Sequence, residues 1–211
     1  MKYYIDFEFS EYFTRDIFFK KKHVIDMISV GIVAEDGRTY YAISNEFSKL
    51  RCNDWVKRNV LTKLDKSIER KSNKQIAAEI FNFINPDLGF HVSGYSNSDF
   101  RDPNSLMNQH FDKHNVTCIN DHYYANPKFV GYYCDYDWVL FCSLFGTMMD
   151  LPPGFPMYCI DLKQKFDEEQ SFETSDLKKL DNYPKQIEDE HNALADAKWI
   201  CELDKFFQCL V

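Results

Sequence analysis

The sequence predicts an α/β protein in which helices pack on a mixed β-sheet. Three strand patterns follow one another within residues 3–44, and strand and helix patterns alternate from residue 129 onward. Strands that give way to such an alternation are typical of this fold class. The chain has 211 residues, 45% of them hydrophobic and 17% aromatic, which is enough for one sizeable core. We therefore expect a single domain over residues 1–211.

The first three predicted elements are strands at 3–9, 24–34 and 38–44. The first alternates aromatic or β-branched residues with acids, and the second is nearly all apolar, which favours a central place in the sheet. Asp36-Gly37 is a strong hairpin signal, so we expect an antiparallel meander. A basic, aromatic connection at 18–22 joins the first two strands. Its three lysines either contact phosphates or form a solvated turn.

Two helix patterns follow, at 55–64 and 75–84. Ser72, with Gln75 three residues later, predicts a capping box at the start of the second helix. From about residue 85 to 128 the periodicity breaks and Asn, Ser, Asp, His and Pro accumulate. We expect an insertion there with little regular structure, and not a second domain.

Four residues of the insertion recur every four positions and are of types that bind zinc. A helix would align them, but residues 116–119 favour a strand and the asparagines on either side favour turns. Surface histidines with one packed cysteine are therefore the favoured interpretation. The four residues are His110, His114, Cys118 and His122.

The remaining elements alternate between strands and helices. Strands are predicted at 129–134 and 157–160, and helices at 135–145 and 192–209. Asp135 is the expected cap of the first of these helices. Asp161 is the expected cap of a further helix that follows the second strand.

Charge and cysteine content narrow the function classes. The net charge of −8 argues against a bulk electrostatic nucleic-acid binder, although metal ions at an acidic site can supply the positive charge that phosphates need. Seven cysteines without a Cys-x-x-Cys pair favour reduced thiols and a cytoplasmic location. We expect no leader peptide, because Met1-Lys2 runs directly into a strand. The longest apolar stretch, 139–149, is too short to span a membrane.

Acids near the start of the chain suggest a metal site. Asp6 and Glu8 alternate on one strand, so they share a face and Phe7 points the other way. Two acids on one face of a buried strand repel each other unless a cation lies between them. An edge strand with one solvated face is the alternative interpretation.

Three further residues complete a candidate set. Asp137 falls in the first turn of the helix at 135–145, and His191 and Asp196 bracket the start of the last helix. Taken singly, an acid in a first turn commonly complements the helix dipole, and a histidine is commonly a surface residue. Together, four carboxylates and one histidine suit two-metal phosphodiester hydrolysis. A neutral histidine can then accept the proton of the attacking water.

The three segments resemble the exonuclease motifs of the DEDD superfamily, histidine subclass (DEDDh, RNase T-like). The motifs are Asp6-Phe7-Glu8, Tyr136-Asp137 and His191-x-x-x-x-Asp196. The flanking segments 28–37, 55–61, 151–158 and 190–197 are similar to the mycobacterial-type 3′–5′ exoribonuclease branch. The resemblance covers most of the chain outside about 85–128. It implies an RNase H-like fold with a five-stranded mixed sheet flanked by helices.

The same resemblance implies a role for each motif residue. Asp6 would bridge two Mg²⁺ or Mn²⁺ ions, and Glu8 and Asp196 would hold the ion that activates water. Asp137 would support the second ion, directly or through water, and His191 would be the general base. Asp161 stands where many relatives have an acid, but we favour its role as a helix cap.

The implied activity is hydrolysis from the 3′ end of single-stranded RNA or 3′ overhangs, with release of nucleoside 5′-monophosphates. DNA is the alternative substrate, and a homodimer is expected from the resemblance alone. Two other classes stay open: a catalytically idle nucleic-acid-binding module, and a metal-dependent phosphatase or nucleotide pyrophosphatase.

Candidate substrate contacts are Phe9, Tyr12 and Lys21. Many relatives have Thr where this chain has Phe9, so we expect the last nucleotide to be held differently. Aromatic side chains close to the acids could stack on bases. Phe7 is expected in the core, which leaves Phe9 and Tyr12 as the better stacking candidates.

Overall fold

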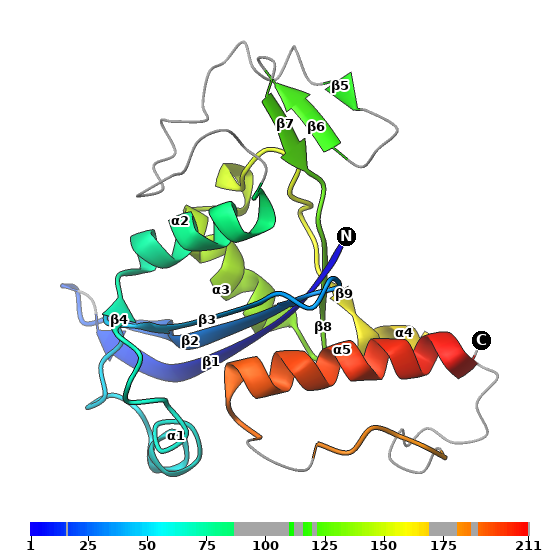
Figure 1. Cartoon of the computed structure of the whole chain (residues 1–211). Coiled ribbons are helices and arrows are strands. Elements are labelled where there is room, and N and C mark those ends of the chain that lie inside the picture. Colours follow the sequence, from blue (N-terminus) through cyan, green and yellow to red (C-terminus); the bar gives the residue numbers. More distant parts are fainter. Residues whose placement is uncertain are drawn as a thin grey trace.

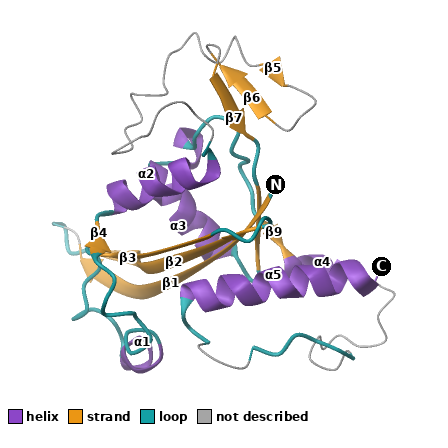
Figure 2. Ribbon diagram, in the orientation of Figure 1, coloured by secondary structure: helices purple, strands orange, loops and turns teal. Residues whose placement is uncertain are grey.

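The computed structural model describes residues 1–15, 17–86, 110–111, 116–119, 122–168, 181–186 and 190–210. Within these residues, α2 and α3 cover one face of a mixed β-sheet and α5 covers the other (Figures 1 and 2). The α/β class predicted from the sequence is therefore confirmed. The helices of the two layers are α2 (Asn73–Ile84), α3 (Asp135–Phe145) and α5 (Ala193–Leu210).

The main sheet has six strands in the described part of the chain, in the order β4-β3-β2-β1-β8-β9. Pairing is antiparallel between β1 and β2 and between β2 and β3, and it is parallel at the other three junctions. The prediction of five strands was wrong because β4 has only two residues, too few to form a sequence pattern. The strands are β1 (Lys2–Arg15), β2 (Lys21–Ala34), β3 (Thr39–Ser44), β4 (Arg70–Lys71), β8 (Lys128–Gly131) and β9 (Ile160–Asp161).

The first two strands are longer than predicted. Both have 14 residues, and their pairing runs from the sheet out to Arg15 opposite Lys21. The register shifts between Glu8 and Phe9, where β2 carries one extra residue. Beyond that bulge neither face of β1 is fully buried, so the sequence lacks the alternation that marks a strand. We call residues 10–15 and 17–26 the hairpin arm.

The two faces of β1 belong to different cores. Tyr3 and Phe7 pack in the cluster that includes α2 and α3, and Phe7 contacts Phe141 edge to face. Tyr4 packs in the second cluster, with the buried side chains of α5. The core position predicted for Phe7 is confirmed. It follows that Asp6 and Glu8, in step with Tyr4, lie on the face that α5 covers.

Helix caps explain most of the helix starts. The Ser72 half of the predicted capping box is confirmed, since Ser72 Oγ accepts a hydrogen bond from Gln75 N–H at 3.2 Å, whereas the Gln75 side chain donates to Glu79 Oε1 at 3.2 Å. Helix α1 (Asp54–Asn59) begins after Asn53, whose side chain accepts from Val56 N–H at 2.8 Å. It ends five residues before the predicted limit of 64. Residue 60 is in turn geometry there and already donates to Val56 O.

The two expected aspartate caps had different outcomes. Asp161 caps α4 (Leu162–Glu168), because its Oδ1 accepts from Lys163 N–H at 2.7 Å and Gln164 N–H at 3.2 Å. Asp135 is not a cap: it lies inside the first turn of α3, after a Cys134 cap residue that makes no side-chain capping bond. The other oxygen of Asp161 accepts from Cys134 N–H at 2.8 Å, so Asp161 supports the start of both helices.

The insertion carries more structure than predicted. It contains β5 (His110–Phe111), β6 (Val116–Ile119) and β7 (His122–Ala125), which form a separate antiparallel sheet beyond α2 (Figure 1). The strand expected at 116–119 is confirmed. Asn85 Oδ1 accepts from Ala125 N–H at 2.8 Å and joins the end of β7 to the end of α2. The side chains of the four possible zinc ligands lie outside the described residues.

Two further observations concern the part of the chain that the structure describes. Six of its cysteines are free thiols, namely Cys52, Cys134, Cys142, Cys159, Cys201 and Cys209. None of its helices combines the length and the apolar character needed to cross a membrane.

Candidate active site

The acidic residues of β1 lie where one edge of the strand is open. Pairing of β1 with β8 covers Lys2 to Tyr4, whereas pairing with β2 continues along the whole strand. The backbone N–H of Phe7 therefore has no strand partner on that side, and it donates to Asp137 Oδ1 at 2.7 Å. This bond fixes the carboxylate of α3 between the positions of Asp6 and Glu8.

A glycine allows α5 to reach the same place. Gly31 of β2 is paired with Asp6, and a Cβ at Gly31 would lie 2.2 Å from Ala193 O and 2.4 Å from Leu194 N. The first turn of α5 thus rests directly on the middle of the sheet. Ala193 is fully buried, in agreement with the expectation that small residues here permit close approach.

The start of α5 is held by a network of side-chain bonds. Asn192 Oδ1 accepts from Leu194 N–H at 3.1 Å and from Ala195 N–H at 3.2 Å, so it satisfies donors that a helix start leaves free. His191 precedes it with a φ of 70°, a left-handed conformation. The N–H of His191 donates to Asp196 Oδ2 at 3.0 Å, and this bond holds the turned backbone in place.

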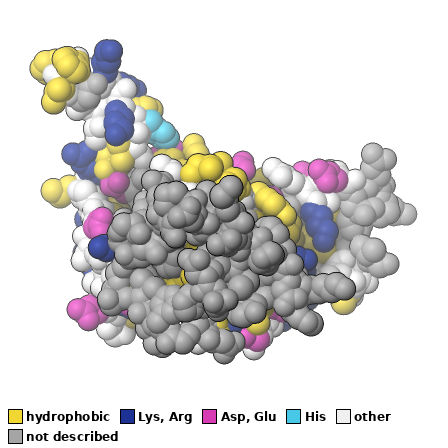
Figure 3. Space-filling view, turned by 90° about the horizontal axis from the view of Figure 1, so that it is seen from above, with side chains coloured by type: hydrophobic (Ala, Val, Ile, Leu, Met, Phe, Trp, Pro, Cys, Tyr) yellow, Lys and Arg dark blue, Asp and Glu magenta, His cyan; other side chains and the backbone are white. Residues whose placement is uncertain are grey.

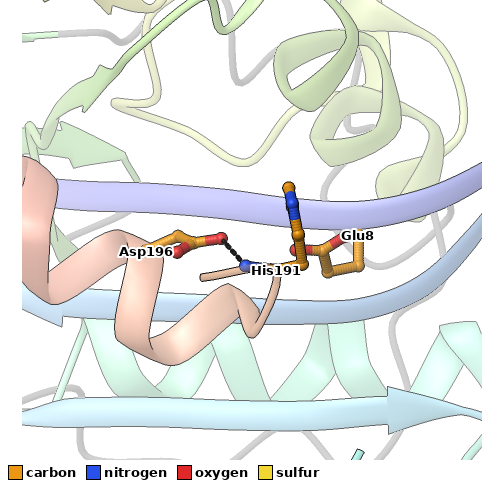
Figure 4. Close-up of side chains that lie close together, drawn as sticks. All are labelled: Glu8, His191 and Asp196. Atoms are coloured by element: carbon orange, nitrogen blue, oxygen red, sulfur yellow. Dashed lines mark hydrogen bonds between the residues drawn. The ribbon is translucent and has the colours of Figure 1, made fainter. Parts of the chain in front are cut away.

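Three of the five candidate residues form one tight group. One potential ligand atom each of Glu8, His191 and Asp196 lies within 4.8 Å of the other two. Figure 4 shows the three side chains gathered where the start of α5 meets β1. Asp6 and Asp137 are not in this tight group, but both lie next to it. Asp6 is two residues before Glu8 on β1, and Asp137 accepts the hydrogen bond from Phe7 N–H, the residue before Glu8.

The acids of the site are electrostatically coupled. Burial raises the pKa of Glu8 to about 8, and the neighbouring charges of Asp196 and Asp137 add to the effect. Burial also raises the pKa of Asp137 to about 7, against the lowering effect of the Phe7 bond. The pKa of Asp6 is raised well above its usual value by burial and then by the charges of Asp137, Asp196 and Glu8. The charged form of the set is thus disfavoured unless a cation is present.

Opposing effects act on the pKa of Asp196, which is raised on balance. Burial raises it, whereas hydrogen bonds from Gln186 and from His191 N–H lower it. Gln186 Nε2 donates to Asp196 Oδ1, so both carboxylate oxygens accept a bond. Asp196 is therefore held in one orientation, facing Glu8.

The donor set fits small divalent cations. Carboxylate oxygens are the ligands that Mg²⁺ and Mn²⁺ prefer, and two or more acids with raised pKa values gain most from a bound cation. Glu8 and Asp137 are buried, so the electrostatic benefit of a cation is little screened by solvent. Four carboxylates suffice for two ions that keep some water ligands.

The three predicted substrate contacts lie outside this set. Phe9 packs edge to face on Tyr136, with ring centroids 5.5 Å apart. The Tyr12 hydroxyl donates to Asp26, and the Arg51 guanidinium lies 4.9 Å from the centre of the Tyr12 ring. Lys21 lies farther out on the hairpin arm.

Two residues with a role at the site were not predicted. Gln186 lies in the polar stretch at 167–190, which has no periodicity that could single it out. Trp55 of α1 contacts the His191 ring edge to face at 4.8 Å between ring centroids. Only its place within the segment at 55–61, which is similar to the exoribonuclease branch, could have drawn attention to it. Both residues act on the orientation of the groups that they touch.

The fold and the site define an α/β protein with a candidate divalent-metal centre. No family model matches the chain. It is similar to two proteins of Mycobacterium tuberculosis, from strains CDC 1551 and H37Rv, and each is named a 3′-5′ exoribonuclease. Identity to each is 28% over 200 residues, which cover 94% of this chain and 88% of the relative.

Proposed function

We propose that the protein is a metal-dependent 3′–5′ exoribonuclease of the DEDDh type. The observation that carries the proposal is the convergence of five residues from three distant segments: Asp6 and Glu8 of β1, Asp137 of α3, and His191 and Asp196 at the start of α5. The strand order around β1, antiparallel on one side and parallel on the other, is compatible with an RNase H-like fold. The named activity of the mycobacterial relatives supports the same conclusion.

Asp6, Glu8, Asp137 and Asp196 would hold two Mg²⁺ or Mn²⁺ ions. When bound, the ions supply positive charge to the scissile phosphate and lower the pKa of the attacking water. The four carboxylates would then be ionised, in contrast with their raised pKa values without a cation. Metal binding would thus release protons.

His191 would accept the proton of the attacking water on an imidazole nitrogen. Its ring lies beside Glu8 and Asp196, and it is partly exposed, so an imidazolium can pass the proton to solvent. Trp55 limits the ring on one side, and the bond from His191 N–H to Asp196 fixes its backbone. The products would be a nucleoside 5′-monophosphate and an RNA shortened by one nucleotide.

The substrate assignment is single-stranded RNA or 3′ overhangs, with DNA as the alternative. The names of the relatives support this assignment. The assignment of RNA depends on those names, because an acidic site of this kind meets mainly the sugar-phosphate backbone. The 2′-hydroxyl is the group by which a protein separates RNA from DNA. A cytoplasmic location and a homodimer belong to the same proposal.

The test is digestion of matched 5′-labelled single-stranded RNA and DNA with Mg²⁺ or Mn²⁺. Wild type is compared with His191→Ala and Asp137→Asn. The second variant is chosen because an asparagine oxygen can still accept the Phe7 bond while the charge is removed. Glu202→Gln, an exposed charge on the distal half of α5, is the matched control.

A 3′-end ladder on RNA that both site variants abolish and the control retains is the expected result. A ladder on DNA alone would move the substrate to the alternative. Release of phosphate from mononucleotides without a ladder would favour a phosphatase or pyrophosphatase. Binding of RNA with no turnover in either metal would favour the idle binding module and refute the exonuclease.

A further inference from the structure

The hairpin arm projects from the sheet and exposes apolar side chains at its end. Ile17, Phe18 and Phe19 are 86%, 73% and 79% exposed. In Figure 3 hydrophobic and basic side chains lie together on this projecting part of the molecule, at the upper left. Large apolar residues grouped at such an extremity mark an interaction surface.

The end of the arm is basic although the protein is acidic. Residues 15–22 contain four cationic residues and one acid, in a chain with a net charge of −8. Lys20, Lys21 and Lys22 are all exposed. Lys21 Nζ lies 3.8 Å from the centre of the Phe13 ring, and Phe13 is itself largely exposed. Cations interleaved with aromatic rings are what single-stranded nucleic acids bind.

A groove lies between the arm and the start of α3, next to the acidic site. It has a volume of about 560 Å³ and is lined by Glu11, Tyr12, Phe13, His23 and Tyr136. Tyr136 precedes Asp137 at the start of α3 and contacts Phe9, the residue after Glu8. Among the lining residues Glu11 is acidic, and its Oε1 lies 2.9 Å from His23 Nε2. The groove therefore extends from Tyr136, the neighbour of Asp137, to the cation above Phe13, and its acid is hydrogen-bonded to His23.

We propose that the groove and the hairpin arm bind the RNA segment on the 5′ side of the scissile bond, with the lysines at 20–22 on its phosphates and Phe13 against a base. The proposal rests on the proposed function, because it assigns a path to the substrate of the same site. The charge of the arm is complementary to a polyanion, whereas the body of the protein is not.

The length of the arm sets the length of RNA that can reach it. Seven residues separate Glu8 from Arg15, about 23 Å at about 3.3 Å per residue in a strand. A nucleic-acid strand stacked at about 3.4 Å per nucleotide covers that distance with about seven nucleotides, and an extended strand with fewer. A dinucleotide fills the site without touching the arm, whereas a 12-nucleotide RNA reaches it.

The experiment compares wild type, the triple variant Lys20→Ala/Lys21→Ala/Lys22→Ala, and Phe13→Ala. The matched control is Lys74→Ala/Lys128→Ala/Lys205→Ala, which removes the same charge from exposed sites outside the arm and groove. Two readouts are taken: kcat/KM on a dinucleotide and on a 12-nucleotide RNA, and equilibrium binding of the 12-nucleotide RNA by fluorescence anisotropy at several salt concentrations.

We expect the triple variant to lose at least about tenfold in binding and kcat/KM on the long RNA, with the dinucleotide unchanged. The log–log salt slope should fall by about 2, since each phosphate contact on a single strand contributes about 0.7. Phe13→Ala should weaken binding of the long RNA about fivefold or more. The control variant should behave as wild type in every readout.

Three results would overturn the proposal. One is an equal loss on both substrates, which would mean that the arm acts on the site itself. The second is unchanged binding and salt slope in the triple variant. The third is a wild-type dimer that the triple variant converts to monomers in sedimentation velocity, with the loss of binding following dissociation. Were wild type to degrade neither substrate, the proposed function would fail, and anisotropy would still decide whether the arm binds RNA.

Discussion

Gly31→Ala should damage the site without touching any of its five residues. The added Cβ would lie 2.2 Å from Ala193 O, 2.3 Å from Ala193 C and 2.4 Å from Leu194 N. These are backbone atoms, so no side-chain rotation relieves the overlap. Ordinary contact needs about 3.5 Å, so the start of α5 must move by about 1 Å.

The expected losses of stability and of catalytic rate can be estimated from this movement. Overpacking of a close contact costs about 1–3 kcal/mol, and a rigid backbone contact belongs at the upper end, about 3 kcal/mol. For a protein of this size that lowers Tm by about 6–12 °C. His191 and Asp196 move with the helix start, and a shift of about 1 Å can cost about 100-fold in kcat.

The assay is differential scanning calorimetry together with single-turnover hydrolysis of a dinucleotide. Gly31→Ala should lower both Tm and the rate, and the rate loss should persist at temperatures where the variant is fully folded. Ala193→Gly should not rescue it, because the overlap involves backbone atoms. Wild-type rate and Tm in Gly31→Ala would refute the argument that the contact of α5 with Gly31 positions the site.

Three further predictions follow from the same geometry. Without divalent ions, Tm should fall as pH rises from about 5 to about 8, and Mg²⁺ should raise Tm more at pH 8 than at pH 5. In that window folded Glu8, with its pKa raised to about 8, keeps a proton that the unfolded chain has released. The free energy of unfolding therefore falls by about 1.4 kcal/mol per pH unit for such a group. A metal-free Tm that is flat from pH 5 to 8 would contradict this prediction. Trp55→Ala should lower kcat about tenfold with little change in Tm, because the ring is half exposed and contacts His191; Trp55→Phe is the control and should retain most of the rate. Asp161→Ala should lower the free energy of unfolding by about 2–4 kcal/mol in urea titrations, since three backbone N–H groups lose their acceptor. Asp161→Asn should lose less stability and keep turnover. Loss of turnover in Asp161→Asn would give Asp161 a catalytic role.

The fold class and most elements could be predicted because burial imposes periodicity on the sequence. The strand at 3–9 and the helix at 135–145 show it clearly, and both are present with the expected faces. The hairpin arm, β4 and the sheet of the insertion were missed in extent or entirely. Their strands are short or lie beyond the core, so no regular alternation of buried residues marks them.

The proximity of the candidate residues could be predicted, but not how they are held together. Asp6, Glu8 and Asp137 follow from strand alternation and a helix start, and the structure brings them next to His191 and Asp196. The bond from Phe7 N–H to Asp137 depends on where β8 leaves β1, a tertiary fact that no local pattern contains. The same holds for the bond from Gln186 to Asp196 and for the start of α3, where Asp161 from another strand accepts from Cys134 N–H.

The contact between Gly31 and α5 also determines when the site can exist during synthesis. Two of its five residues arrive with the segment at 191–196, and the helix that follows must pack on β2 before they are in place. A nascent chain that has released only the first 190 residues from the ribosome therefore has three of the acids but no base. Under the proposed function, the chain cannot attack the messenger that encodes it until almost the whole domain has folded.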